Sequence, residues 1–406
     1  MTTLDIELKS KEDNSIPEVS QEEIQEERKR RKLLLLLVVL LLILCCVGYF
    51  FVNYLLKPQP IPEMLPASVS QAVVYPPTYK LSFPADAPVG VAVSPDGQRI
   101  YVVESAGERL VKIFDRDGNF IKSFAPPGTT RSNRKPTYIA VDAGGRVFLN
   151  DTYNNVIAVF DAEGIFLDGI ISKDATLTEF VAGKNGGTVP QGALYYYNNI
   201  TKTVDYKLPG QSAKSAPGPD QSNWSPLGIR FDQNGNLMIT NIVTGRHEVV
   251  IYPASDLAGS WLSFNPQIKS FGVVGKDAGQ LSFPNSVVTD SLGNFYVSDG
   301  NNGRISAWTV DMQYKSFFAF GSTEDALNLP RGMWMDVNDR LHVADAVGQF
   351  IRVYDVSGAE PAFLYNFGAF GQLEGEFNFP IDICMDTTGR LFIADRENNR
   401  VQIWSY

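Results

Sequence analysis

The sequence is poor in the side chains that most often build zinc and thiolate sites. Its 406 residues include three cysteines and two histidines. Cys45 and Cys46 lie in a hydrophobic run and Cys384 stands alone in a strand-like segment, so there is neither a disulfide framework nor a CxxC motif. We therefore exclude a structural zinc site built on thiolates, and expect no metal and no other cofactor.

The sequence also lacks an excess of basic charge. Its formal net charge is −10 at pH 7, and phosphate backbones attract clustered Lys and Arg, so we expect no nucleic-acid partner. In contrast, 44% of the residues are hydrophobic, and 34 Gly and 24 Pro supply many turn formers. This composition is typical of an all-β domain with a sizeable core.

One long apolar run, Leu33–Val52, contains no charged residue. At about 1.5 Å per residue, a helix of this length crosses the ~30 Å hydrocarbon layer of a membrane. A cleaved signal peptide is the alternative, but its apolar region is shorter and ends in small residues, whereas this run continues into GYFFVNYLL. We expect a signal-anchor, that is, an uncleaved transmembrane helix over residues 33–56.

The basic cluster RKRRK at residues 28–32 sets the expected orientation, because positive residues remain on the cytoplasmic side. This predicts a single-pass protein of the cell membrane with a disordered cytoplasmic tail over residues 1–32. A Pro-rich stalk over residues 57–76 follows the helix. The rest of the chain is then extracytoplasmic, either extracellular or periplasmic.

A repeated pattern fills residues 77–406. FPNSVVTDSLGNFYVSDGNNGRISAW from Phe283 and FPIDICMDTTGRLFIADRENNRVQIW from Phe379 match without gaps, and each holds three alternating runs separated by turn residues. Looser copies begin at Pro88, Pro136, Pro226 and Pro330. Six units at roughly 40-residue spacing predict a six-bladed β-propeller of four-stranded blades.

The last unit stops after three runs, so its blade needs a strand from elsewhere. TYKLSF at residues 78–83 resembles FIKSF at residues 120–124, the fourth run of the first unit. We expect strand 78–83 to complete the last blade, which leaves no open sheet edge in the ring.

These units resemble the NHL repeat. FGVVGKDAGQLSFP and FGAFGQLEGEFNFP carry its Gly-rich approach, and YVSDGNNGRI and FIADRENNRV carry its Asp, Asn and Arg turn. The resemblance implies a six-bladed propeller that binds protein, RNA or a small ligand, but the fold alone does not decide function.

An acid and an arginine flank the tight turn of the two strongest units, as Asp299 with Arg304 and Asp395 with Arg400. At this spacing the carboxylate accepts hydrogen bonds from turn amides or from the guanidinium. Because the pair recurs, we predict that it supports the blade structure. The other units lose the arginine or replace the acid, at Glu104, Asp151, Asn241 and Asp345, and we expect these blades to be less regular.

The first strand of each blade lines the central channel, where we expect Tyr138, Asn285, Arg331 and Asp382 near the opening. One carboxylate and one amide make a poor metal cage, but the set suits a small polar ligand or the tail of a protein. We therefore predict non-catalytic binding of an extracytoplasmic protein or small polar ligand.

The alternative is an enzyme of the lactonase or lyase type with its site at the same opening. Propeller lyases of the amidating class need a ring of zinc-binding histidines, and lactonases need acids and Asn around a divalent cation. His342 takes the place of an aromatic residue in a strand, and we expect His247 at the surface, so this sequence supplies no such ring. We predict no catalytic residue.

Residues 171–225 form an insertion that is long for a connection between blades. The alternation from Ala193 to Leu208 around an Asn pair predicts a hairpin, and the segment PGQSAKSAPGPDQSN after it resembles a linker. Its aromatic residues Tyr195–Tyr197 either form a partner-binding surface or pack against the propeller wall.

Overall fold

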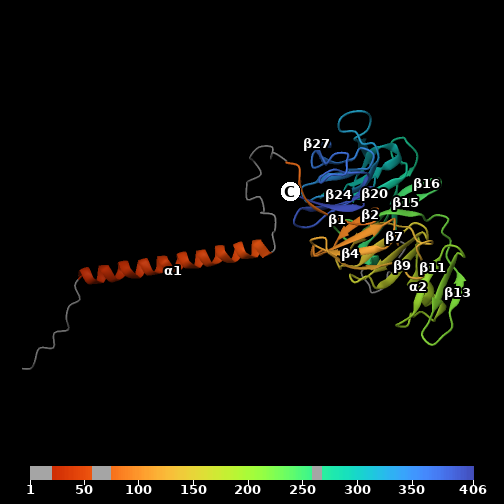
Figure 1. Cartoon of the computed structure of the whole chain (residues 1–406), viewed down its shortest axis with the longest axis horizontal. Coiled ribbons are helices and arrows are strands. Elements are labelled where there is room, and N and C mark those ends of the chain that lie inside the picture. Colours follow the sequence, from red (N-terminus) through yellow and green to blue (C-terminus); the bar gives the residue numbers. More distant parts are fainter. Residues whose placement is uncertain (1–20, 57–74, 258–267) are drawn as a thin grey trace, which may run out of the picture. The chain divides into compact units, whose positions relative to one another are not determined.

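A computed structural model describes residues 21–56, 75–257 and 268–406 (Figure 1). The chain divides into two units, Met1–Pro62 and Glu63–Tyr406, which we describe separately. The predictions for residues 1–20 and for residues 57–74 of the stalk lie outside the described residues.

The described residues of the first unit form one helix, α1 (Gln21–Leu56). Within it, Arg28–Tyr49 is long and apolar enough to cross a membrane, with a mean hydropathy of 2.8. The helix begins well before the apolar run, so the prediction of a disordered tail is wrong for residues 21–32. Apart from Ile24, this segment consists of Gln, Glu, Lys and Arg, and all four are strong helix formers; Glu26 also precedes Arg30 by one helical turn.

The described residues of the second unit form six antiparallel blades, numbered here as blades 1 to 6 in chain order, and the predicted all-β propeller is confirmed. Five of the blades have four strands, and blade 2 has a short fifth strand, β10 (Ala175–Thr176). Blade 1 contains β2 (Pro88–Val93), β3 (Arg99–Glu104), β4 (Val111–Asp115) and β5 (Phe120–Phe124). Blade 2 contains β6 (Pro136–Val141), β7 (Val147–Asp151), β8 (Val156–Phe160) and β9 (Phe166–Ser172). Blade 3 contains β14 (Pro226–Phe231), β15 (Leu237–Val243), β16 (Arg246–Tyr252) and β17 (Lys269–Phe271).

The second half of the ring repeats this order. Blade 4 contains β20 (Pro284–Thr289), β21 (Phe295–Asp299), β22 (Arg304–Trp308) and β23 (Tyr314–Phe318). Blade 5 contains β24 (Pro330–Met335), β25 (Arg340–Asp345), β26 (Phe350–Asp355) and β27 (Ala362–Phe367). Blade 6 contains β28 (Pro380–Met385), β29 (Arg390–Asp395) and β30 (Arg400–Ser405), with β1 (Thr78–Pro84) as its fourth strand.

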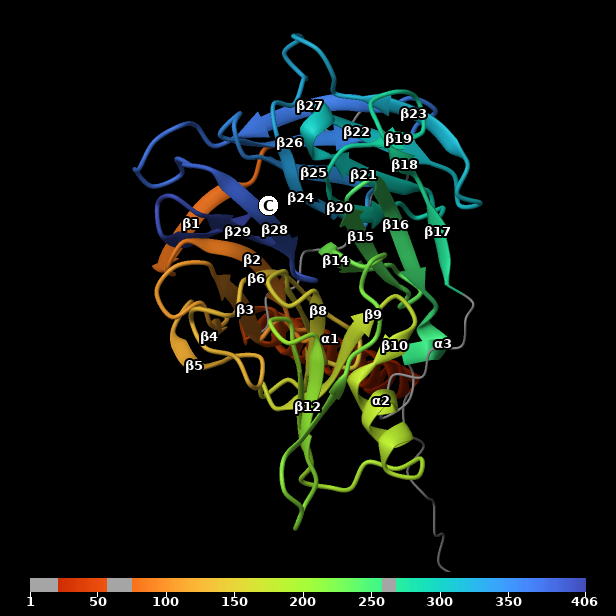
Figure 2. The same ribbon diagram turned by 90° about the vertical axis from the view of Figure 1, so that its right-hand side faces the viewer.

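β1 joins the two ends of the propeller. It pairs antiparallel with β30 from Thr78 opposite Ser405 to Pro84 opposite Arg400. Because the first strands contact one another in sequence and β28 also contacts β2, the ring is closed (Figure 2). The blade that looked one strand short in the sequence is therefore complete.

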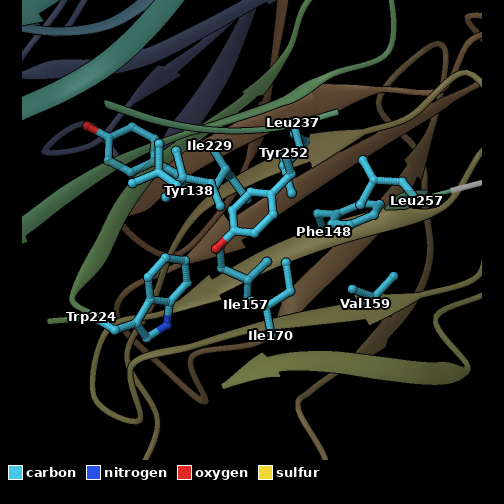
Figure 3. Close-up of a cluster of buried hydrophobic side chains, with 13 residues drawn as sticks. Tyr138, Phe148, Ile157, Val159, Ile170, Trp224, Ile229, Leu237, Tyr252 and Leu257 are labelled. Atoms are coloured by element: carbon cyan, nitrogen blue, oxygen red, sulfur yellow. The ribbon is translucent and has the colours of Figure 1, made fainter. Parts of the chain in front are cut away.

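The core lies between the blades. In Figure 3, Phe148, Ile157 and Tyr138 of blade 2 pack against Ile229 and Tyr252 of blade 3. Further clusters join other neighbouring blades in the same way. A single blade cannot bury its faces alone, so each depends on its neighbours for stability.

In all six blades, a polar side chain near the end of the second strand accepts a backbone N–H bond from the segment that leads into the first strand. These side chains are Glu104, Asp151, Asn241, Asp299, Asp345 and Asp395. Arg304 and Arg400 each donate to their Asp at 2.8 Å. In units that depart from the pattern, other side chains pair with the acid, such as Lys112 with Glu104 and Arg352 with Asp345. These units nevertheless keep the same backbone contact.

The insertion extends blade 2 away from the ring (Figure 1). It contains β10 (Ala175–Thr176), α2 (Leu177–Lys184) and a sheet of β11 (Leu194–Asn198), β12 (Thr203–Lys207) and β13 (Lys214–Pro217). The expected hairpin is β11 with β12, but β13 forms in the segment expected to be a linker, so that expectation is wrong. Tyr195 and Tyr197 are buried beside α2 and β9, which favours packing over an open aromatic surface.

Candidate functional site

A buried ion pair lies at the axis of the ring, between the first strands of blades 3 and 6. Nη2 of Arg230 on β14 lies 2.5 Å from Oδ1 of Asp382 on β28, and both side chains are almost completely buried. The same guanidinium reaches carbonyl oxygens of Ile139 on β6, Met333 on β24 and Ile383 on β28. One arginine thus bridges the first strands of blades 2, 3, 5 and 6.

Asp382 is also held by blade 1, so this ion pair contacts five of the six blades. Its Oδ2 accepts a hydrogen bond of 3.0 Å from the backbone N–H of Val91 on β2. Burial raises the pKa of Asp382, and the charge of Arg230 opposes that shift. Because its oxygens serve Arg230 and Val91 and its exposed fraction is 0%, this predicted ligand residue is an internal support of the ring.

Arg331 and Asn285 lie closer to the ends where the first strands begin, since each is the second residue of its strand. Nη1 of Arg331 donates to Oδ1 of Asn285 at 2.6 Å, and Nδ2 of Asn285 donates to the carbonyl oxygen of Phe283 at 2.8 Å. Arg331 is partly exposed, yet its Nε is buried and has no hydrogen-bond partner among the described residues. Asn285 therefore fixes one edge of a guanidinium whose Nε remains unsatisfied.

Tyr138 lies close to Arg331 and Asp382. Its ring packs in the cluster between blades 2 and 3, and its hydroxyl points away from that cluster (Figure 3). Burial raises the pKa of Tyr138, and the charges of Arg331, Asp382 and Arg230 all act on this phenol. The phenol is therefore protonated at neutral pH and can donate a hydrogen bond.

The charges of this group do not balance. It contains two guanidinium groups and one carboxylate, and the carboxylate is paired with Arg230. Within the described parts of the chain, Arg331 has no ion-pair partner; its one hydrogen-bonding partner is the amide of Asn285. This group of residues therefore carries one uncompensated positive charge, on Arg331.

Arg230 was not foreseen from the sequence, although a signal was present. At the corresponding fifth position of the first strands, the other blades carry apolar residues, namely Ala92, Ala140, Val288, Trp334 and Cys384. A charged side chain at such a position must be paired or pay a large desolvation cost. That exception could have indicated a buried ion pair.

The two histidines lie away from the channel. His342 on β25 is fully buried, its Nε2 lies 2.6 Å from the hydroxyl of Tyr406, and burial lowers its pKa to about 4. His247 on β16 is also buried, which overturns the expectation of a surface histidine, because its ring packs against Phe283 with centroids 5.0 Å apart. Across residues 21–56, 75–257 and 268–406, no three His, Cys, Asp or Glu side chains gather to hold a metal ion.

A family model described as "NHL repeat" matches residues 281–308 and 377–404. The chain contains NHL repeats. The two matched NHL repeats cover the first three strands of blades 4 and 6, which are also the blades with the Asp299–Arg304 and Asp395–Arg400 pairs. The resemblance noted in the sequence is therefore confirmed.

Solved structures with a similar fold include two lyases. A streptogramin B lyase is 13% identical, with a TM-score of 0.49 over 81% of this chain and 96% of that chain. Virginiamycin B lyase from Staphylococcus aureus is 14% identical, with a TM-score of 0.49 over 79% and 94% of the two chains. A protein of unknown function from Bacteroides thetaiotaomicron is 15% identical, with a TM-score of 0.49 over 79% and 70%. These similarities carry no argument about the chemistry of this chain.

Proposed function

We propose that this protein is a membrane-anchored, extracytoplasmic binding module that holds a protein or a small polar ligand at one opening of the propeller channel. The relevant side is the entrance face, defined here as the face where first strands begin, formed by the connections into β6, β20, β24 and β28. Arg331 carries the proposal, because it is a partly exposed cation at that opening and has no ion-pair partner in the described parts of the chain.

The neighbouring contacts favour binding over catalysis. Asp382 and Arg230 neutralise each other inside the channel, and Asn285 is engaged by Arg331 and by the carbonyl of Phe283. These bonds orient the guanidinium of Arg331, and they leave the carboxylate of Asp382 engaged, so that it is not free to act as a base or a metal ligand. No observation at this opening favours the lactonase or lyase alternative.

The membrane part of the proposal rests on α1. The span Arg28–Tyr49 has the length and composition of a transmembrane helix, and the basic cluster at residues 28–32 begins it. By the positive-inside rule, the propeller then lies outside the cytoplasm. In intact cells, a membrane-impermeant maleimide should label Ile200→Cys, at an exposed turn of the insertion, whereas a cysteine at Glu26 should be labelled only after lysis.

Crosslinking in the native membrane tests the binding site. In one variant, a photoreactive residue replaces Phe283 on the entrance face. In a control variant, it replaces Leu292, an exposed apolar residue in the turn on the opposite face of the same blade. We expect a discrete crosslinked species from position 283 and none from position 292. Crosslinks that form equally from both positions, or from neither, would contradict the proposed site.

A further inference from the structure

Two phenylalanines stand at the entrances of β20 and β28. Phe283 and Phe379 directly precede Pro284 and Pro380, and their φ angles are +51° and +62°. A residue before proline normally adopts an extended conformation, and residues other than Gly, Asn and Asp rarely adopt a positive φ. Both phenylalanines therefore hold an unusual conformation on the entrance face.

Specific contacts fix these two residues. The ring of Phe283 packs on His247, while the backbone N–H of Phe379 donates to Oε1 of Gln349 at 2.6 Å and the guanidinium of Arg396 lies 5.8 Å from the ring centroid. Phe283 is nonetheless 43% exposed, and Phe379 is partly exposed. Each strand entrance thus offers apolar surface at a fixed place.

The strand between them carries the unpaired cation. In the ring, β24 contacts β20 on one side and β28 on the other. Arg331 is the second residue of β24, so its guanidinium belongs to the blade between the two phenylalanines. The Nε of Arg331 is buried, but the residue as a whole is partly exposed, and an anionic oxygen would pair with the exposed part of its guanidinium through a charge-assisted bond.

This inference rests on the proposed function and names the chemistry of the ligand. We infer that the entrance face recognises a carboxylate joined to an apolar group, with the carboxylate on Arg331 and the apolar group against Phe283 and Phe379. A carboxylate matches the planar guanidinium, and its single negative charge balances the single excess positive charge at this opening. The phenol of Tyr138 is a second donor, since the charge of Arg331 acts on it.

Two sources could supply this group, namely a small apolar acid or the free C-terminus of a peptide that ends in an apolar residue. The test uses the full chain in micelles of a non-ionic detergent, with isothermal titration of benzoate, benzamide and inorganic phosphate at pH 7.5. We expect saturable binding of benzoate and at least about tenfold weaker binding of the other two, because a hydrogen bond to a charged group contributes about one to two factors of ten. Peptides ending in Phe with a free or an amidated C-terminus then separate the two sources.

Arg331→Gln should weaken benzoate binding at least about tenfold, whereas Arg131→Gln should not change it, since Arg131 is an exposed arginine on the β5–β6 connection of the same face. Equal binding of benzamide and benzoate to the unmodified protein would overturn the inference, as would the absence of benzoate binding or unchanged affinity in Arg331→Gln. If position 283 still crosslinks in such a case, and Arg331→Gln lowers the yield of that crosslink, the proposed function stands and only the carboxylate assignment fails.

Discussion

Arg230 and Asp382, which are 152 residues apart in the sequence, form a buried ion pair between blades 3 and 6. These blades lie on opposite sides of the ring, so the pair links the two halves of the propeller across its axis.

Removing one member of this pair should be strongly destabilising. Arg230→Met leaves the carboxylate of Asp382 buried without its cation, and we expect a loss of about 3–5 kcal/mol in the free energy of unfolding. Arg230→Met combined with Asp382→Leu should lose less, because no buried charge remains. Urea unfolding in detergent micelles measures both; a double variant that is less stable than Arg230→Met would contradict this account.

Gly332 makes room for Asp382. A Cβ atom at Gly332 would lie 2.1 Å from Oδ1 of Asp382, which Arg230 holds in place. We expect Gly332→Ala to destabilise the propeller by about 1–3 kcal/mol through overpacking. Gly183→Ala in α2 is the matched control, since its Cβ would meet no atom within 4 Å and alanine favours a helix. Similar melting temperatures for the two variants would rule out the steric argument.

The closure of the ring depends on β1. Phe83 near its end is buried and packs on Phe114 with ring centroids 4.5 Å apart, whereas Phe120 on β5 is largely exposed. Phe83→Ala should cost about 3–5 kcal/mol in the free energy of unfolding, and Phe120→Ala should cost much less. If both substitutions lowered stability equally, β1 would not be an integral strand of blade 6.

Asp168 should make the stability of the propeller and its insertion depend on pH. Its Oδ1 accepts bonds from the backbone N–H groups of Gly169 and Thr178, its Oδ2 is buried without a partner, and burial raises its pKa to about 6. Because the folded-state pKa lies above the ordinary value of 3.8, the folded protein binds the proton more tightly than the unfolded chain does. The resulting stabilisation is complete below about pH 4 and is lost as the pH rises through about 6.

Between about pH 4 and pH 6, the free energy of unfolding of the unmodified protein should fall by up to roughly 3 kcal/mol relative to that of Asp168→Asn, which cannot ionise. Urea unfolding of both proteins at pH 4, 5, 6 and 7 measures the difference. A difference that stays constant with pH would show that Asp168 is not the group responsible.

The architecture was predictable from the sequence because it depends on repeated local features. The alternation of apolar residues, the turn residues and the Pro that opens each first strand occur in every blade, and the missing fourth strand pointed to residues 78–83. The hairpin of β11 and β12 followed from similar local signals. In contrast, β13 was missed because Lys214–Pro217 has weak strand propensity and pairs only in the context of β12.

The site was predictable only in part. Tyr138, Asn285, Arg331 and Asp382 lie near one another, because the second and third residues of the first strands meet close to one axis. The pairing of Asp382 with Arg230 joins residues of opposite blades, and no local pattern specifies which long side chain reaches across the ring. The burial of His247 likewise depends on Phe283, which comes from the next blade.

The most direct test of the central claim combines the crosslinking position with the charge at the opening. With the photoreactive residue at position 283 in the native membrane, we expect Arg331→Gln to lower the yield of the crosslinked species at least about tenfold. Arg131→Gln, which removes the same charge elsewhere on the entrance face, should leave the yield unchanged. If the protein with Arg331→Gln and the protein that keeps Arg331 gave equal yields of the crosslinked species, the claim that the channel opening is the binding site would be contradicted.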